Sequence, residues 1–476
     1  MKRTLVINAV GLTPELMSQS MPRLVEWSKS RHEVHVVPDL PAVTCTAQAS
    51  MLTGLKPGGI NGGHGAVANG WFFRDLSEVW LWRQSVELIT PSLQRTNEQA
   101  SSAQNFDTIF DRWRAAHPGS TTAQIFWWWN LPSRADLSVT PRPTYWADGS
   151  KGPDIHSNPP SLRQRLQDEL GPFPLFQFWG PGAGIASTRW IIDATLNVLQ
   201  KDQPGLTLCY LPHLDYDLQR FGPHSPEAGT AAKELDAELF RLLEFADQNH
   251  LETVVLSEYG LEEVDQAVEP NRALRSAGLL QVHPAKNGAL LDPGNSDAFA
   301  LCDHQAAHVY VKDPSRIEEV ASLLENLQGV ETVYRTNQFA EIGLDHPRSG
   351  ELFCLAERGT WFAYPYWIDG DVEPDFARTV DIHRKPGFDP CELFLDPRKP
   401  WIKARMAAKL LAKKLGMRVT MDLIPVDTSL VKGSHGRLPT TPQQGPLWIG
   451  PKQWLPLGRD WISPQEALSG ICNRPS

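Results

Sequence analysis

The chain has 476 residues and a formal net charge of -10, and its composition, 41% hydrophobic and 21% charged, is typical of globular proteins. This composition argues against a disordered or fibrous chain, and the negative charge argues against nucleic acid as a main partner. No run approaches the roughly 18 apolar residues of a membrane span, and the six cysteines are scattered with no CxxC pair. We therefore expect a reduced, cytoplasmic protein without a membrane span.

The apolar patterns alternate between strands and helices. Two strand, helix, strand units are predicted: 4–10, a helix ending near 30 and 33–37, and then 206–210, 226–249 and 253–257. This alternation predicts an α/β fold with a parallel sheet. In such sheets functional residues collect where strands end on the carboxyl side, which directs attention to the residues after Val10, Tyr210 and Leu256.

The character of the chain changes after about residue 278. Further strands and a helix are predicted at 308–311, 314–327, 330–334 and 352–356. These elements favour a small α+β cap inserted in the main sheet, with core segments over 1–277 and 396–476 and the cap over 278–395. Aromatic clusters at 126–129 and 173–179 are interpreted as core, and a basic helix at 401–415 as a solvated face.

A threonine motif carries the strongest functional signal. Residues 40–44 read LPAVT, Gly54 follows ten residues after Thr44, and residues 64–69 read HGAVAN and end in Asn69. This pattern resembles the signature of the type I phosphodiesterase/nucleotide pyrophosphatase family, a branch of the alkaline-phosphatase superfamily. The resemblance implies an alkaline-phosphatase-like α/β/α sandwich with a mostly parallel central sheet. It also implies that Thr44 attacks phosphorus, that divalent metal activates it, and that Asn69 holds the phosphoryl oxygens.

Several metal ligands of the family are replaced in this chain. Asp215, in the run 210–223, matches a metal-binding aspartate, but Gln219 stands four residues later where the family has histidine. Asp217 is a possible substitute for that histidine. The run 257–260, SEYG, matches the family's Ser-Asp-His-Gly, so that Glu258 keeps a carboxylate and Tyr259 replaces the imidazole. Val10 occupies the position of a further metal-binding aspartate.

Two histidines compete for the remaining ligand position. His435 lies in a Ser-His-Gly loop before a last core strand, and His383 lies in a stretched form of the family's His-Gly-Tyr-Asp. His304 is a weaker candidate, with a structural role favoured. With these replacements we predict one divalent ion, zinc, rather than two, bound by Asp215 with His435 or His383. Glu258 and Gln219 are further candidate metal ligands, and Gln219 is the weaker of the two because its amide is neutral.

The resemblance implies a hydrolase of phosphate esters that acts on a small phosphorylated metabolite. Arg74, soon after Asn69, is a candidate clamp for a phosphate oxygen, with an ion pair to Asp75 or Glu78 as the alternative. Val10, Gln219 and Tyr259 favour a different function: a weakened or inactive member of the family that binds a phosphorylated metabolite or a partner protein.

Overall fold

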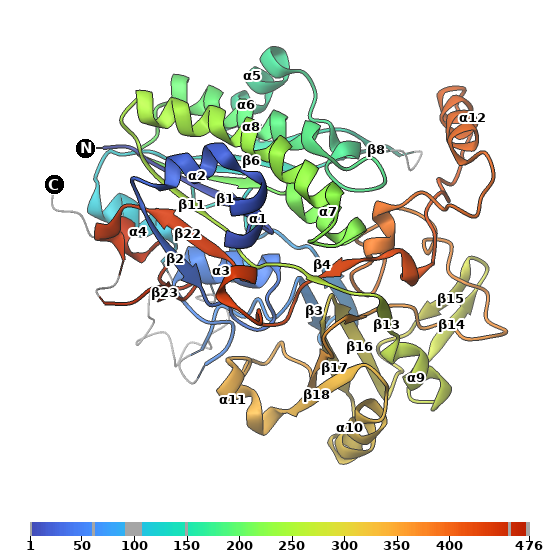
Figure 1. Ribbon diagram of the computed structural model, residues 1–476. Helices are drawn as coiled ribbons and strands as arrows, with labels where there is room; N and C mark the ends of the chain where they lie inside the picture. Colours follow the sequence, from blue (N-terminus) through green and yellow to red (C-terminus); the bar gives the residue numbers. More distant parts are fainter. Residues whose placement is uncertain (1, 60–61, 91–106, 148–150, 456–457, 473–476) are drawn as a thin grey trace.

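A nine-stranded sheet forms the centre of the computed structural model, which describes residues 2–59, 62–90, 107–147, 151–455 and 458–472 (Figure 1). Its strands, in spatial order, are β23 (Trp461–Ile462), β2 (His32–Val36), β22 (Leu447–Gly450), β11 (Glu252–Leu256), β1 (Thr4–Ala9), β10 (Leu206–Leu211), β5 (Thr122–Ile125), β6 (Leu137–Pro141) and β9 (Ile155–Asn158). Neighbouring strands from β11 to β6 run parallel, whereas β22 and β9 are antiparallel to their partners. The prediction of a mostly parallel sheet is confirmed.

The central strands are apolar on both faces because helices cover both faces. Every residue of β1 and β10 is buried. One layer of helices packs above the sheet in Figure 1 and comprises α1 (Pro14–Ser20), α2 (Pro22–Ser28), α5 (Pro160–Leu170), α6 (Ile185–Lys201), α7 (His213–Phe221) and α8 (Pro226–Gln248). Below it lies α3 (Thr44–Thr53), and α4 (Ile109–Ala116) lies beside the end of α3, where Arg112 donates to the Thr53 carbonyl at 2.9 Å. The fold is thus α/β, with a mostly parallel central sheet between two layers of helices, as predicted.

One local prediction is wrong: the first helix, expected to run unbroken to about residue 30, is two helices. Proline lacks a backbone N–H and clashes with the preceding turn, so Pro22 starts a new helix instead of continuing the old one. Met21 between them leaves helical geometry at φ -124° and ψ 67°.

A second sheet with its own buried cluster lies below the central one in Figure 1. Its antiparallel strands are, in order, β16 (Ala298–Asp303), β17 (Ala306–Val311), β19 (Leu352–Ala356) and β18 (Val330–Arg335), flanked by α9 (Pro270–Ser276) and α10 (Ile317–Glu325). The C-terminal β22 and β23 return to the central sheet. The domain boundaries at 277 and 395 stay a prediction.

Shorter elements connect these parts. They are the ladders β3 (Gly70–Phe73) with β4 (Glu78–Leu81), β7 (Thr144–Tyr145) with β8 (Lys151–Gly152), β12 (Glu262–Glu263) with β21 (Gly433–Ser434), β13 (Gln266–Val268) with β20 (Thr360–Phe362) and β14 (Val282–Ala285) with β15 (Gly288–Leu291), and the helices α11 (Phe339–Ile342) and α12 (Ile402–Lys414).

The aromatic prediction is confirmed at 126–129, which is buried throughout, but only in part at 173–179, where Phe173 is buried and Phe176 is exposed. Among the described helices, none has the length and apolar character needed to cross a membrane.

Candidate active site

The carboxyl ends of three adjacent central strands supply most of the candidate site. Val10 follows β1, Asp215 lies in the first turn of α7 just after β10, and Glu258 and Tyr259 follow β11. Thr44 is the first residue of α3, whose ten residues are all buried. Parallel register therefore brings together side chains that lie more than 200 residues apart in the sequence.

The Thr44 hydroxyl lies among acidic and phenolic side chains. Its Oγ1 is 3.0 Å from the Tyr259 hydroxyl, and it also interacts with the carboxyl of Glu258. The start of a helix carries a partial positive charge that favours an anion. The backbone N–H of Cys45, next in α3, donates to Asn69 Oδ1 at 2.9 Å, so Asn69 is fixed beside Thr44.

Asp303, which the sequence analysis missed, holds Asn69 from the second sheet. The backbone N–H of Asn69 donates to Asp303 Oδ2 at 2.7 Å and its side-chain amide donates to Oδ1 at 3.0 Å. The two residues are 234 positions apart. The only sequence signal was an Asp-His pair in a turn between two strands, and nothing in it pointed to Asn69.

Glu258 is a fully buried carboxyl held by two amides. Asn8 donates to its Oε1 at 2.5 Å, and the Gln48 side-chain amide donates to the same atom. Burial raises the pKa of Glu258 to about 8, although the hydrogen bonds from Gln48, Asn8 and Thr44 act in the opposite direction. The side chain is therefore mostly protonated at neutral pH. Its second oxygen has no hydrogen-bond partner among the described residues.

Asp215 is the second buried carboxyl. The Gln219 side-chain amide donates to its Oδ2 at 2.7 Å, and the Tyr259 hydroxyl donates to Oδ1 at 3.4 Å. Burial raises the pKa of Asp215 to about 6, and His304, Gln219 and Tyr259 lower it. Asp215 is thus charged at neutral pH while Glu258 is mostly neutral.

Four rings stack in a column beside Asp215. Tyr259 stacks on His435 with centroids 3.6 Å apart, His435 lies 3.6 Å from His304, and His304 lies 3.7 Å from Phe388. His435 Nδ1 donates to the Ala42 carbonyl at 2.7 Å, and burial holds its pKa well below the usual value. The neutral ring therefore has its lone pair on Nε2, which is buried without a hydrogen-bond partner and 3.9 Å from Asp215 Oδ1.

Of the two competing histidines, the structure brings His435 to Asp215 and leaves His383 elsewhere. His383 is exposed and interacts with the Leu81 backbone and with Asp381. His304, for which a structural role was favoured, does bond to Asp303 at 2.7 Å, but it also lies in the ring column close enough to influence Asp215.

The structure does not bring Arg74 to Thr44. Its guanidinium pairs with Glu351 at 2.8 Å and donates to the Ser349 carbonyl at 3.1 Å, so it joins β3 to the second sheet. The expected alternative was an ion pair with Asp75 or Glu78, and the acid that pairs with Arg74 is instead Glu351, directly before β19.

These residues do not fit the two-metal centre that the resemblance implies. At one metal position Val10 has no ligand atom, the Tyr259 hydroxyl bonds to Thr44, and Glu258 holds two amide donors instead of a cation. At the other position Asp215 and His435 face each other, but Gln219 turns a donor N–H toward Asp215. Zinc sites need at least three protein ligands. Within the described ranges no three His, Cys, Asp or Glu side chains are arranged to hold a metal ion.

We expect purified protein to carry no more than one divalent ion per chain. With Val10 and Tyr259 in place of two ligands, only Asp215 and His435 offer suitable atoms, and two ligands bind zinc weakly. Elemental analysis after gentle purification measures the content. Two stoichiometric zinc ions would contradict this account of the ligand set.

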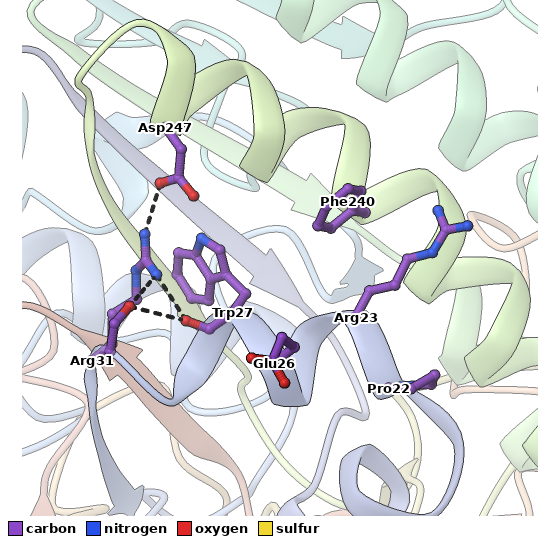
Figure 2. A pocket seen from close by; sticks show the side chains of 8 residues that line it. Pro22, Arg23, Glu26, Trp27, Arg31, Phe240 and Asp247 are labelled. Atoms are coloured by element: carbon purple, nitrogen blue, oxygen red, sulfur yellow. Dashed lines mark hydrogen bonds and ion pairs between the residues drawn. The ribbon is translucent and has the colours of Figure 1, made fainter.

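Surface hollows formed by the described residues include two that lie outside this cluster. One of about 490 Å³ lies between α2 and α8, where the Arg31 guanidinium bonds to Asp247 at 2.7 Å and stacks over Trp27 (Figure 2). Another, of about 160 Å³, is lined by residues that include Gly11, Leu218 and Leu261, close in sequence to the site residues. Thr44 itself is only 5% exposed. A ligand therefore reaches it only if covering side chains move.

Two curated proteins match part of the chain in sequence. Over 255 residues the chain is 24% identical to an uncharacterized pyrophosphatase/phosphodiesterase of Schizosaccharomyces pombe, which covers 53% of this chain and 41% of that protein. It is also 24% identical over 197 residues to human ectonucleotide pyrophosphatase/phosphodiesterase family member 7. That match covers 40% of this chain and 39% of the human protein. The chain thus spans about two fifths of the length of these curated relatives.

Solved structures share the fold at low identity. Murine ectonucleotide pyrophosphatase/phosphodiesterase 5 superposes with a TM-score of 0.53 at 14% identity, covering 99% of this chain and 94% of that one. Phosphonoacetate hydrolase from Sinorhizobium meliloti, in complex with phosphonoformate, superposes with a TM-score of 0.56 at 13% identity. The match covers 99% of this chain and 95% of the hydrolase chain. An inactive threonine-to-alanine variant of the murine protein has been solved in complex with AMP. It superposes with a TM-score of 0.54 at 13% identity, and the match covers 99% of this chain and 94% of the variant chain.

The sequence pattern of one family matches residues 4–389, which include Thr44, Asn69, Asp215 and Glu258. The chain belongs to the type I phosphodiesterase/nucleotide pyrophosphatase family.

Proposed function

We propose that this protein hydrolyses a phosphate ester of a small phosphorylated metabolite, with Thr44 as the nucleophile. The observation that carries the proposal is the position of the Thr44 hydroxyl at the start of α3, in contact with both Tyr259 and the buried carboxyl of Glu258. A threonine hydroxyl attacks only when a neighbouring group removes its proton, and Glu258 is the nearest acid suited to do so.

The reaction proceeds in two displacements. Thr44 Oγ1 bonds to phosphorus while its proton passes to the ionised Glu258, and the bond from phosphorus to the ester oxygen breaks. The departing oxygen takes a proton from water. A water molecule then attacks the phosphorylated Thr44 and gives one proton to its oxygen, which restores the hydroxyl, while Glu258 releases its proton to the solvent. A monoester yields phosphate, and a diester yields a phosphate monoester. The N-terminus of α3 and the Asn69 amide stabilise the charge that develops on the phosphoryl oxygens.

Tyr259 positions the nucleophile in this scheme. Burial and the nearby acids Asp215 and Glu258 raise its pKa well above the usual value, so the phenol stays protonated. When the phenol donates to Thr44 Oγ1, at 3.0 Å, instead of to Asp215, the single proton of the threonine hydroxyl is left to point at Glu258. This chain thereby places a phenol and a carboxyl where the family resemblance implied a metal.

The substrate class follows by analogy. The murine neighbour is an ectonucleotide pyrophosphatase/phosphodiesterase whose inactive variant binds AMP, and the inactivating change is at a threonine. Nucleotide phosphodiesters are therefore the first esters to examine. Phosphonates come second, because the Sinorhizobium hydrolase shares the fold.

A second candidate function is binding without turnover. The tight packing of the site favours it: Thr44 is 5% exposed, its hydroxyl already has partners, and Val10 removes a ligand that the family uses. Such a protein would retain a phosphorylated metabolite or a partner protein and would release it unchanged.

We expect turnover of at least one ester in a broad panel of phosphate mono- and diesters, and we expect that turnover to persist in a chelator because no step above uses a metal. Loss of turnover in the chelator would contradict the proposed role of Glu258.

If no ester reacts and AMP nevertheless raises the melting temperature, as a ligand of the native state must, the binding function is supported instead.

A further inference from the structure

The segment around α12 differs in charge from the rest of the chain. Between positions 397 and 421 there is no acidic residue, although the whole chain has a net charge of -10. The same stretch contains eight basic residues: Arg398, Lys399, Lys403, Arg405, Lys409, Lys413, Lys414 and Arg418. A local excess of this size attracts anions irrespective of the net charge of the molecule.

α12 projects from the body of the protein and has no buried residue (Figure 1). Trp401, just before it, is 83% exposed, and Leu411 and Leu415 are 59% and 69% exposed. Ala404, Ala408, Leu411 and Leu415 recur with the spacing of one helical face and are all exposed. This arrangement forms an apolar stripe that begins at Trp401 and has no covering element among the described residues.

The opposite side of the helix is tied to the protein. Lys409 bonds to Asp422 and donates to the Thr420 carbonyl at 2.7 Å, and Lys399 donates to the Asp422 carbonyl at 2.6 Å. Lys403, Arg405, Lys413, Lys414 and Arg418 have no ion pair within the part of the chain that the structure describes. Of these, Lys403, Arg405 and Lys414 lie about a quarter turn from the apolar stripe and are available to an external anion, whereas Lys413 shares the opposite side with Lys409.

We propose that α12 docks the protein on an anionic lipid surface, with Trp401, Leu411 and Leu415 inserted among the lipids and the flanking lysines on the headgroups. Exposed apolar residues on one helical face, basic residues beside them and a tryptophan at the edge are the features of helices that lie in the plane of a membrane interface. A partner that offered only acidic groups would leave the apolar stripe in water, whereas a bilayer accepts both kinds of side chain.

Sedimentation of the full-length protein with vesicles tests this inference. We expect binding to phosphatidylcholine vesicles that contain phosphatidylglycerol, weak binding to phosphatidylcholine alone, and loss of binding at high salt. The double variant Lys403→Gln/Lys414→Gln should bind about thirtyfold more weakly, because each basic residue near such a surface contributes on the order of fivefold. Trp401→Ser/Leu415→Ser should weaken binding while the salt dependence stays.

Matched controls distinguish binding through this surface from nonspecific adsorption to the vesicles. Lys233→Gln/Lys286→Gln removes two exposed lysines elsewhere, and Val372→Ser removes an apolar side chain that is 70% exposed, close to the value for Leu415. Both should bind like the wild type, and all variants should keep its melting temperature. The proposal fails if the wild type does not bind anionic vesicles, if the controls weaken binding equally, or if heparin is bound and vesicles are not.

Discussion

Replacing Thr44 with alanine is expected to abolish turnover of any ester that the protein hydrolyses, by a factor of at least ~10⁴. The change removes the atom that attacks phosphorus, while Asn69 and the start of α3 still hold the phosphate. Asn69→Ala should lower turnover less, on the order of 10² to 10³-fold, because Asn69 stabilises charge and forms no covalent bond. Steady-state kinetics on the most responsive ester measures both effects.

Thr53→Ala is the matched control for this experiment. Thr53 ends the same helix, is also 5% exposed, and its hydroxyl donates to the Ala49 carbonyl at 2.7 Å. The control should lose some stability and keep its turnover. Turnover that survives Thr44→Ala unchanged would refute Thr44 as the nucleophile, whichever ester is used.

Replacing Glu258 with glutamine is expected to lower kcat/KM by about 10² to 10⁴-fold, the usual contribution of a general base. In the wild type kcat/KM should rise with pH up to about 8 and level off above it, because only the ionised carboxyl accepts the Thr44 proton. The variant should lack this rise. Glutamine keeps the oxygen that accepts from Asn8 and Gln48, so the fold should remain.

The same carboxyl should affect stability in the opposite direction. Burial raises its pKa from 4.5 to about 8, so the protonated form is favoured in the folded state. The stabilisation that protonated Glu258 gives to the folded state is complete below pH 4.5 and is lost as pH rises toward 8. The free energy of unfolding should fall by about 1.4 kcal/mol per pH unit in this range, the value for one proton. Denaturant unfolding from pH 5 to 9 should therefore show a steeper decline for the wild type than for Glu258→Gln. Equal slopes, or a wild-type kcat/KM that does not change between pH 6 and 9, would contradict the role of Glu258.

The sequence by itself determined the fold class and directed attention to Thr44, the proposed nucleophile. Alternating apolar strands and helices indicate a parallel sheet, because period-2 and helical patterns are local properties of the chain. The motif around Thr44 and Asn69 is also local, so it was recognisable without coordinates. The apolar pattern did not reveal the break at Pro22. The apolar periodicity continues through this residue, but proline has no N–H to continue the helical hydrogen bonds.

Only the tertiary structure decided which side chains surround Thr44. His435 and His383 looked alike as sequence motifs, and the return of β22 to the central sheet is what brings His435 to Asp215. Asp303 meets Asn69 across 234 positions, and Asn8 meets Glu258 across 250. Contacts of this kind depend on how sheets and loops pack in space, so they cannot be predicted from the hydrophobic periodicity of the sequence. The pKa values of Asp215 and Glu258 diverge for the same reason, since burial and partner groups are properties of the folded molecule.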